Sequence, residues 1–323
     1  MVFAEKGAKG GKKIPKKDER KKKACYNEFD YIGKKKKTIQ EAIKMSDKKL
    51  RLVDSHTHSN CSFDGHFTHK EMAEAAKKAN VAILAITDHC DLVCVDCEMN
   101  ERNKQDIYRS FEETKKVQVE GVKMLAGIEL GQYLHRKETA QEILAEKEWD
   151  FVLGSLHNTY ENEDPYFVNF FTWEDSEAQI FYENYLRELL WAAREADYDS
   201  LAHITYPVRY IVGDYEKELV EDRLFGLYRQ ILETVIERDK SLEINTGGIR
   251  KKIGLPSPDE ELIRFYYTLG GRKITVGSDA HYTEHVGADL EETCRLLKEI
   301  GFEGVQIYEK RIPTLFTFEE MGI

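Results

Sequence analysis

Two histidines, His56 and His58, follow a short apolar stretch and stand two residues apart. In a β-strand, alternate side chains point to the same side, so both imidazoles can be directed at one point just past the strand end. This spacing is typical of metal ligands. The pair alone is equally compatible with two surface histidines, so the interpretation depends on which other residues could converge on the same point.

Potential ligands also follow the later apolar segments of the chain. Of the ten histidines, six stand at such positions, whereas chance placement would spread them over helices and loops. Together with three carboxylates they form a set of nine candidate metal ligands: His56, His58, Asp64, His89, Glu129, His157, His203, Asp279 and His281.

Imidazole and carboxylate ligands without thiolates suit Zn, Mn or Fe. Nine ligands are too many for one ion, so we expect two or three divalent ions with about three protein ligands each. Three such ions and three carboxylates would leave a residual charge of about +3, enough to hold a dianionic phosphate. Multi-metal sites of this kind clamp phosphate oxygens and lower the pKa of a bound water, as in phosphatases.

Seven short apolar segments alternate with segments of helical period, which predicts βα units and a parallel sheet. Seven units favour a closed barrel, whose carboxyl strand ends share one mouth. Thr68 and Glu71 form a capping-box pattern, and Gly270, Gly271 and Gly301 are typical helix stops. The predicted strands are 50–54, 81–87, 122–130, 150–155, 199–204, 241–246 and 273–278. The predicted helices are 69–80, 101–119, 138–148, 175–197, 216–239, 258–269 and 288–300.

The charge of the chain is unevenly distributed. The net charge is −11, yet residues 1–50 hold 17 Lys+Arg against 7 Asp+Glu and are strongly basic. We expect residues 1–48 to be a disordered basic extension and residues 49–323 to be the catalytic domain. Residues 51–323 therefore carry the excess of acidic side chains, and their negative charge disfavours binding to duplex nucleic acid.

Membrane insertion and secretion are not indicated by the sequence. No apolar run approaches the roughly 18 residues of a membrane span, and the N-terminus lacks an apolar signal core. Six cysteines in such a chain favour reduced thiols in a cytoplasmic protein, and Cys94 and Cys97 are read as loop cysteines rather than a redox pair or zinc clip. His66, His69, His135 and His285 lack the strand-end placement, so we expect them not to be ligands.

The strand-end motifs resemble those of the PHP (polymerase and histidinol phosphatase) family, over about residues 50–312. The resemblance implies an α/β fold, a distorted (β/α)7 TIM-like barrel of the PHP type, with three metals. The motifs are His56-Thr-His58, Thr87-Asp-His89, Gly127-Ile-Glu129, Ser155-Leu-His157, Ala202-His203 and Gly277-Ser-Asp-Ala-His281. Finer matches, His203-Ile-Thr-Tyr-Pro-Val-Arg-Tyr210 and Leu242-Glu-Ile-Asn-Thr-Gly247, resemble the histidinol-phosphatase branch.

The same resemblance implies how the ligands are shared. The first metal would take His56, His58, Glu129 and Asp279. The second would share Glu129 and add His157 and His203, and the third would take Asp64, His89 and His281. Asp64 replaces a histidine found in many family members, as in the histidinol-phosphatase branch.

The implied activity is metal-dependent hydrolysis of a small-molecule phosphomonoester, L-histidinol phosphate, in histidine biosynthesis. Glu129, Asp279, His281 and Arg209 would form the catalytic set, with Arg209 as a phosphate clamp. Arg250 is either a second phosphate ligand or an ordinary loop residue. Two alternatives remain: a PHP-type nuclease acting on nucleotide ends, and a non-catalytic metal-binding regulatory module.

Overall fold

A parallel sheet forms the centre of the molecule in the computed structural model, which describes residues 50–94, 97–98 and 101–323. The strands follow the order β1-β2-β6-β7-β8-β9-β10, with β3 paired to the end of β6. Their bounds are β1 Leu52–Asp54, β2 Val81–Ile86, β3 His89–Asp91, β6 Lys123–Gly131, β7 Phe151–Ser155, β8 Ser200–Leu201, β9 Ser241–Asn245 and β10 Ile274–Gly277. All seven strands predicted from the sequence are confirmed within a few residues.

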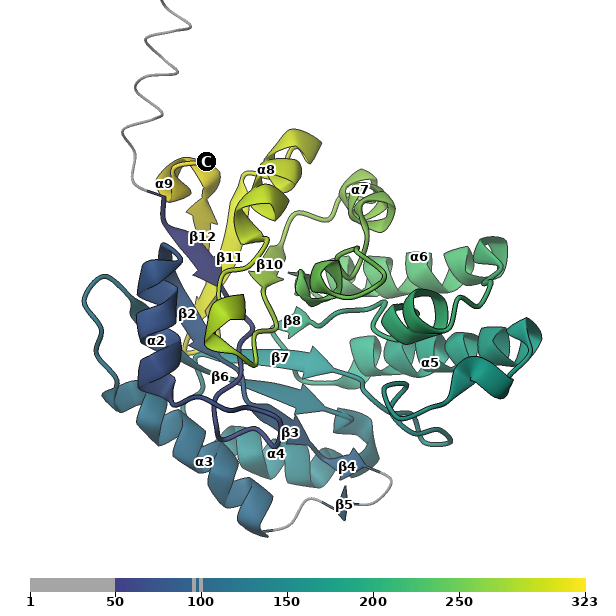
Figure 1. The fold of residues 1–323 in the computed structure, drawn as a ribbon, viewed down its shortest axis with the longest axis horizontal. Helices are drawn as coiled ribbons and strands as arrows, with labels where there is room; N and C mark the ends of the chain where they lie inside the picture. Colours follow the sequence, from purple (N-terminus) through teal and green to yellow (C-terminus); the bar gives the residue numbers. More distant parts are fainter. Residues whose placement is uncertain (1–49, 95–96, 99–100) are drawn as a thin grey trace, which may run out of the picture. The chain divides into compact units, whose positions relative to one another are not determined.

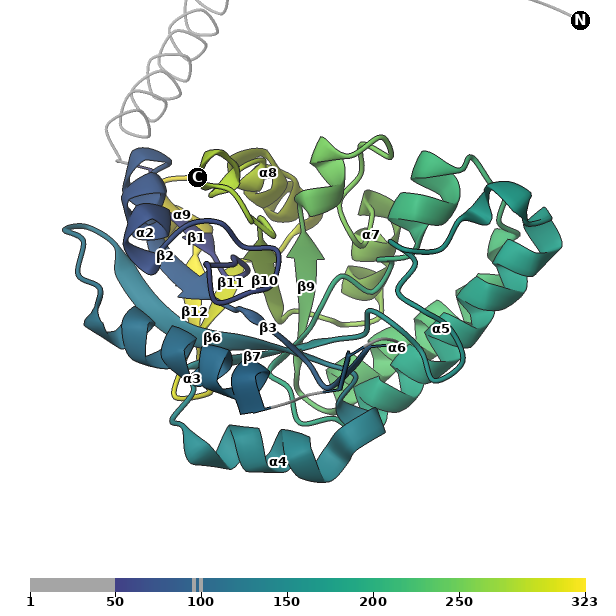
Figure 2. The same ribbon diagram turned by 60° about the horizontal axis from the view of Figure 1, so that its bottom comes forward.

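Helices lie outside the strands, as Figures 1 and 2 show. They are α2 His69–Lys78, α3 Glu101–Lys116, α4 Lys137–Glu146, α5 Asp175–Glu195, α6 Glu221–Glu237, α7 Glu260–Thr268, α8 Leu290–Ile300 and α9 Phe318–Met321. The predicted capping box opens α2: the Thr68 hydroxyl accepts from Glu71 N, and Thr68 N donates to the Glu71 carboxylate at 2.8 Å. Gly301 ends α8 with a φ of 119°, a conformation that glycine adopts without strain.

The barrel closes between its first and last strands, just beyond their regular hydrogen-bonded parts. Ser55 N donates to Val276 O at 2.9 Å, Asp279 N to His56 O at 2.8 Å and His58 N to Ala280 O at 2.9 Å. Gly277 allows this approach, because a Cβ there would lie 2.3 Å from the Cβ of His56. The segments that close the barrel are therefore those that carry the predicted ligands.

Several elements were not predicted from the sequence. A hairpin of β11 (Gly304–Glu309) and β12 (Ile312–Thr317) follows α8, and a smaller one joins β4 (Val93–Cys94) to β5 (Cys97–Glu98). A π-helical turn, η3 (Arg209–Asp214), precedes α6, so this helix begins five residues later than predicted. The predicted fold class, a distorted (β/α)7 barrel, is confirmed.

Residues 50–323 form one compact unit. The predicted basic extension, residues 1–48, lies outside the described residues. Among the helices that the structure describes, none combines the length and apolar character needed to cross a membrane.

Candidate metal centre

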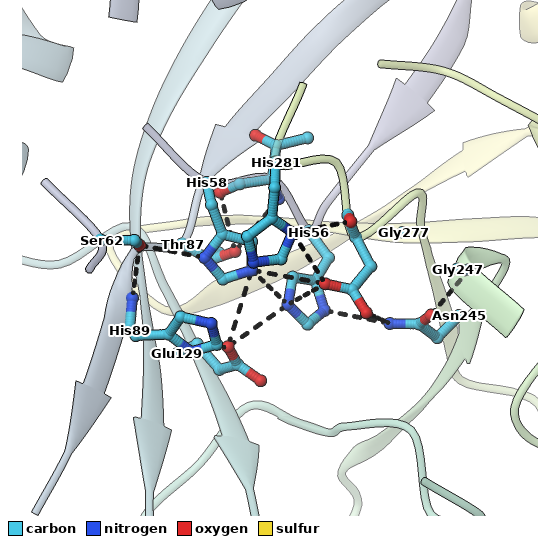
Figure 3. A network of polar contacts seen from close by, with 12 residues as sticks. His56, His58, Ser62, Thr87, His89, Glu129, Asn245, Gly247, Gly277 and His281 are labelled. Atoms are coloured by element: carbon cyan, nitrogen blue, oxygen red, sulfur yellow. Dashed lines mark hydrogen bonds and ion pairs between the residues drawn. The ribbon is translucent and has the colours of Figure 1, made fainter. Parts of the chain in front are cut away.

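The carboxyl ends of the barrel strands bring the predicted ligands together. Figure 3 shows the imidazoles of His56, His58, His89 and His281 pointing toward one another around Glu129. Each strand ends at or just before its ligand. Because the carboxyl ends of parallel strands in a barrel face the same mouth, these ligands lie close together there. His56, His58 and Glu129 are at most 1% exposed, so their polar atoms can be satisfied only from within the site.

Four of these residues form a tight first group. The Nε2 atoms of His56 and His58 lie 3.0 Å apart. Glu129 Oε2 lies 3.5 and 3.7 Å from the two nitrogens, and Asp279 Oδ1 lies 3.7 and 3.5 Å from them. Metal–ligand bonds of about 2.0–2.2 Å in a tetrahedron would separate ligand atoms by about 3.3–3.6 Å. The group therefore has the dimensions of a four-ligand metal site.

Glu129 also belongs to a second group through its other oxygen. Its Oε1 lies 3.1 Å from His157 Nε2 and 2.9 Å from His203 Nε2. Glu129 Oε2 also lies 2.7 Å from His89 Nδ1, so the two oxygens of this carboxylate face two different sets of histidines. This is the geometry expected of a carboxylate that bridges two metal ions.

A third group lies next to the first. Asp64 Oδ2 is 3.0 Å from His281 Nε2, and Asp64 Oδ1 is 3.6 Å from His89 Nε2. The ring of His58 stacks on those of His89 and His281, with centroids 4.2 and 4.1 Å away. All nine predicted ligands thus fall into three adjoining groups, and the ligation itself remains a prediction.

The electrostatics of the site are compatible with bound cations. Burial raises the pKa of Glu129, but His56, His89 and His157 outweigh it and hold that pKa well below its usual range. Burial, together with His281 and His89, lowers the pKa of His58 to about 3, so its imidazole is neutral and can offer a lone pair. Among the described residues, buried Glu129 Oε2, Asp64 Oδ1 and His281 Nε2 form no well-oriented hydrogen bond, although Glu129 Oε2 lies 2.7 Å from His89 Nδ1 and His281 Nε2 lies 3.0 Å from Asp64 Oδ2. Polar atoms converging at ligand spacing fit the metals that the sequence predicts.

Three carboxylates, those of Glu243, Asp91 and Asp88, orient the ligand rings through contacts to their Nδ1 atoms, Asp88 acting through Ser62. Glu243 lies 2.6 Å from His56 Nδ1 and accepts from His203 N at 2.9 Å, while Asp91 lies 2.9 Å from His157 Nδ1. The His58 ring contacts the Ser62 hydroxyl at 3.2 Å, and that hydroxyl donates to Asp88 at 2.7 Å. Such partners fix the ring and leave Nε2 for a metal.

The sequence interpretation did not single out Glu243 or Asp91. Glu243 could have been recognised from its place in the middle of the buried strand β9, because a buried carboxylate needs a partner. Asp91 could have been recognised because it stands two residues after His89, on the same side of an extended strand.

The two predicted phosphate-binding arginines contact the loop that carries Asp279. Buried Arg209 donates to Asp279 Oδ2 at 3.1 Å and to Asn245 Oδ1 at 2.6 Å, and its Nε has no hydrogen-bond partner among the described residues. Arg250 donates to the carbonyl oxygens of Ser278 and Thr246, the latter at 3.5 Å. Arg209 therefore lies at the centre itself, whereas Arg250 holds the backbone beside it.

The Asp279 backbone is held in an unusual conformation. Its φ is 57°, a region that costs energy for residues other than glycine and is often retained at functional sites. The buried carboxylate of Asp54 fixes the preceding residue, accepting from Ser278 N at 2.8 Å and from its hydroxyl at 2.5 Å. The strain is thus sustained by contacts between the first and last strands.

The four remaining histidines of the body do not join the three groups. His135 pairs with Glu188, and His66 and His285 lie against the ring of Tyr282. His69 lies in α2 beside Ser110 and Glu113. These four histidines therefore lie apart from the three groups of predicted ligands, and the expectation that they are not ligands of this centre stays a prediction.

Comparisons with known proteins identify the family of this chain. The model of the PHP domain family matches residues 54–247. The "Probable histidinol-phosphatase" of Thermotoga maritima is 29% identical over 266 residues, which are 82% of this chain and 99% of the relative. The protein of the same name from Clostridium acetobutylicum is 30% identical over 270 residues, with 81% and 98% covered.

A solved structure shares the fold. It is the histidinol phosphate phosphatase of Lactococcus lactis, complexed with zinc, L-histidinol and phosphate. The two structures superpose with a TM-score of 0.68 at 24% identity, covering 82% of this chain and 99% of the other.

Proposed function

The chain belongs to the PHP domain family, and from this premise we propose that it is a metal-dependent phosphomonoesterase that converts L-histidinol phosphate to L-histidinol and phosphate. The observation that carries the proposal is the position of Glu129, whose Oε2 faces His56, His58 and His89 and whose Oε1 faces His157 and His203. A bridging carboxylate is what a multi-metal phosphatase site requires.

We propose three ions, with the ligand sets that the three groups define. His56, His58, Glu129 and Asp279 would hold the first, and Glu129, His157 and His203 the second. Asp64, His89 and His281 would hold the third. When bound, these ions supply positive charge for the phosphate oxygens and lower the pKa of a water. Zinc is supported by the ligand types and by the Lactococcus lactis structure, and Mn or Fe are compatible with the oxygen ligand Asp64.

The residues of the chain contribute binding, orientation and exclusion of water. Arg209 keeps one donor, Nε, that no described residue uses, and this nitrogen is available to a phosphate oxygen. Glu243 and Asp91 fix the tautomers of His56 and His157, so that each Nε2 faces the centre. The buried walls keep the reacting groups out of bulk water, which strengthens each electrostatic contact.

A further carboxylate, Asp164, is suited to the cationic part of the substrate. It follows β7 in the sequence and accepts from the Tyr206 hydroxyl at 2.9 Å. The Tyr206 ring contacts the rings of His157 and His203, with centroids 5.3 and 5.2 Å away. Tyr206 therefore links Asp164 to two of the predicted metal ligands. An amine or imidazole of histidinol would find its counter-charge here.

The activity is tested by comparing substrates that share only the phosphate. The phosphate contacts cannot distinguish them, so selectivity must come from groups around the rest of the molecule. Two or three polar contacts of roughly 1 kcal/mol each give about a hundredfold preference. We therefore expect kcat/KM for L-histidinol phosphate to exceed that for p-nitrophenyl phosphate by at least about this factor, and Asp164→Asn to reduce the difference.

Other outcomes of the same assay decide between the alternatives. Equal kcat/KM values would leave a metal-dependent phosphatase without this substrate. A preference for the ends of short oligonucleotides would identify a nuclease instead. Absence of turnover on every substrate, with metals bound, would leave only a metal-binding module.

A further inference from the structure

A second cluster of metal-ligand types lies outside the nine residues described above. Cys61 belongs to the loop after β1, His69 is the first residue of α2, and Glu113 lies in α3. Their thiol, imidazole and carboxylate ligand atoms all lie within 4.8 Å of one another. None of the three is needed for the phosphatase centre.

The hydrogen bonds around His69 determine which of its nitrogens carries a proton. The Ser110 hydroxyl donates its single proton to Asp88 Oδ2 at 2.5 Å, so it can only accept from His69 Nε2, 3.3 Å away. Nε2 is therefore the protonated nitrogen in the neutral ring, and Nδ1 carries the lone pair. Asp88 also accepts from Ser59 and Ser62, which is consistent with an ionised carboxylate.

The lone pair of His69 Nδ1 faces a carboxylate. Nδ1 has no hydrogen-bond partner among the described residues and lies 3.3 Å from Glu113 Oε2, while the His69 side chain is only 1% exposed. Two acceptors at this distance repel each other unless a cation lies between them. A proton would suffice if the imidazole were charged; burial lowers the pKa of His69 below its usual value, although Asp88 and Glu113 raise it.

We propose that Cys61, His69 and Glu113 bind a divalent zinc ion at a site separate from the phosphatase centre. A thiolate, an imidazole and a carboxylate are each ligands that zinc takes in proteins, and three of them would leave a fourth position for water. The Glu113 side chain is 40% exposed, which gives the ion a route from solvent. Burial and the carboxylates of Asp88 and Glu113 raise the pKa of the Cys61 thiol to about 12, so zinc binding must release its proton.

The site would support the phosphatase centre without taking part in the reaction. Cys61 and His69 bracket the segment that contains Asp64, a ligand of the third group. An ion bound to both would tie the two ends of this segment to α3. The Ser110–Asp88–Ser62 chain connects the same region to the His58 ring.

Cobalt provides a direct test, because a thiolate bound to Co²⁺ gives a charge-transfer band that imidazoles and carboxylates do not. The nine residues of the phosphatase centre include no cysteine. We expect the Co²⁺-loaded full-length protein to show this band and Cys61→Ser to lose it. Cys294→Ser is the matched control, since Cys294 is another buried free thiol and lies in α8.

Elemental analysis with zinc provides an independent measurement. Glu113→Gln changes a partly exposed side chain, so it should fold normally and lose about one zinc equivalent relative to the parent protein. A Cys94→Ser/Cys97→Ser double variant should keep both the cobalt band and the zinc. Failure of phosphatase activity would not alter any of these readouts, so the two proposals can fail separately.

Two results would overturn the proposal. A cobalt-loaded protein without a thiolate band would mean that Cys61 is not a ligand and that His69 and Glu113 share a proton. A band that survives Cys61→Ser but disappears in the Cys94→Ser/Cys97→Ser variant would place the thiolate ligands elsewhere. Circular dichroism melting of each variant distinguishes the loss of a ligand from the loss of the fold.

Discussion

Glu243 and the His56 Nδ1 atom are 2.6 Å apart, deep inside the barrel and fully shielded from solvent. The carboxylate accepts the ring proton, so His56 must present its other nitrogen to His58 and Glu129. Glu243 also accepts from His203 N at 2.9 Å, and one side chain thereby positions ligands of two groups. Glu243 therefore positions two of the predicted ligands without being one of the nine.

Glu243→Gln should weaken metal binding about 10–100-fold, the usual loss when a partner behind a ligating histidine is removed. The amide keeps the shape of the side chain but removes the charge that stabilises the His56 ring. Titration with a competing chelator measures the change in affinity. Glu233→Gln, on the outer surface of α6, is the control and should bind metal as the parent protein does. Unchanged affinity in Glu243→Gln would show that the contact is only structural.

Glu129→Gln should abolish turnover and reduce the metal content. An amide lacks the charge of the carboxylate and cannot bridge two ions, so the two adjoining groups would lose a shared ligand. Elemental analysis and the phosphatase assay measure the two effects on the same sample. Retention of parental metal content and activity would exclude a bridging role for Glu129.

The purified protein should contain two or three ions per chain when no chelator is used, because nine converging ligands exceed what one ion needs. Removing these ions should lower the melting temperature, since a ligand at 100 times its Kd stabilises the folded state by about 2.7 kcal/mol. Elemental analysis counts the ions, and calorimetry with and without chelator measures the stabilisation. Full activity with one ion or fewer would disprove the three-metal proposal.

Arg209→Ala should decrease kcat/KM about 10²–10³-fold, as does the loss of one donor to a reacting centre. The guanidinium contacts Asp279 and Asn245, and no described residue uses its Nε, so the loss should be similar for L-histidinol phosphate and p-nitrophenyl phosphate. Arg209→Lys should be only partly active, because an ammonium keeps the charge but not the fork of donors. A loss confined to one substrate would assign Arg209 to substrate selection instead.

Deletion of residues 1–45 should leave both the melting temperature and the turnover nearly unchanged. All nine predicted ligands belong to residues 50–323, and the deleted part is rich in lysine and poor in large apolar residues. Such a segment buries too little surface to offset an ordering cost of about 1–2 kcal/mol per residue. Thermal melting and the phosphatase assay on the shortened protein test this, and a large decrease in either would move the domain boundary toward the N-terminus.

Most of the barrel could be predicted from the sequence because its strands are short apolar segments followed at once by polar residues. The segment Val81–Ile86 is an example, because it is apolar throughout and almost fully buried. It ends three residues before His89. The β11–β12 hairpin could not be predicted in the same way. Its second strand is mostly exposed, so it lacks the continuous apolar character on which the prediction relied.

The site was predictable where a residue type and a strand end coincide, and unpredictable where a contact spans the barrel. His56 and His58 are recognisable from their own spacing. Glu243 acts on His56 from 187 residues away, and only the closure of the barrel brings the two together. The inward contacts of Arg209 also depend on the π-helical turn η3, which the local sequence does not indicate.

The closure of the barrel has a consequence for how the protein is made. Asp54 and Ser278 are hydrogen-bonded although they are 224 positions apart, and Asp279 and His281 stand one and three residues after Ser278. A ribosome adding about 5–20 residues per second needs on the order of 10–45 s to cover this interval. During that time the emerging chain displays His56 and His58 without the carboxylate that completes their group. If these residues bind metal as we propose, correct loading would have to wait until synthesis is nearly finished, and a nascent chain that captured an ion early would do so with an incomplete set of ligands.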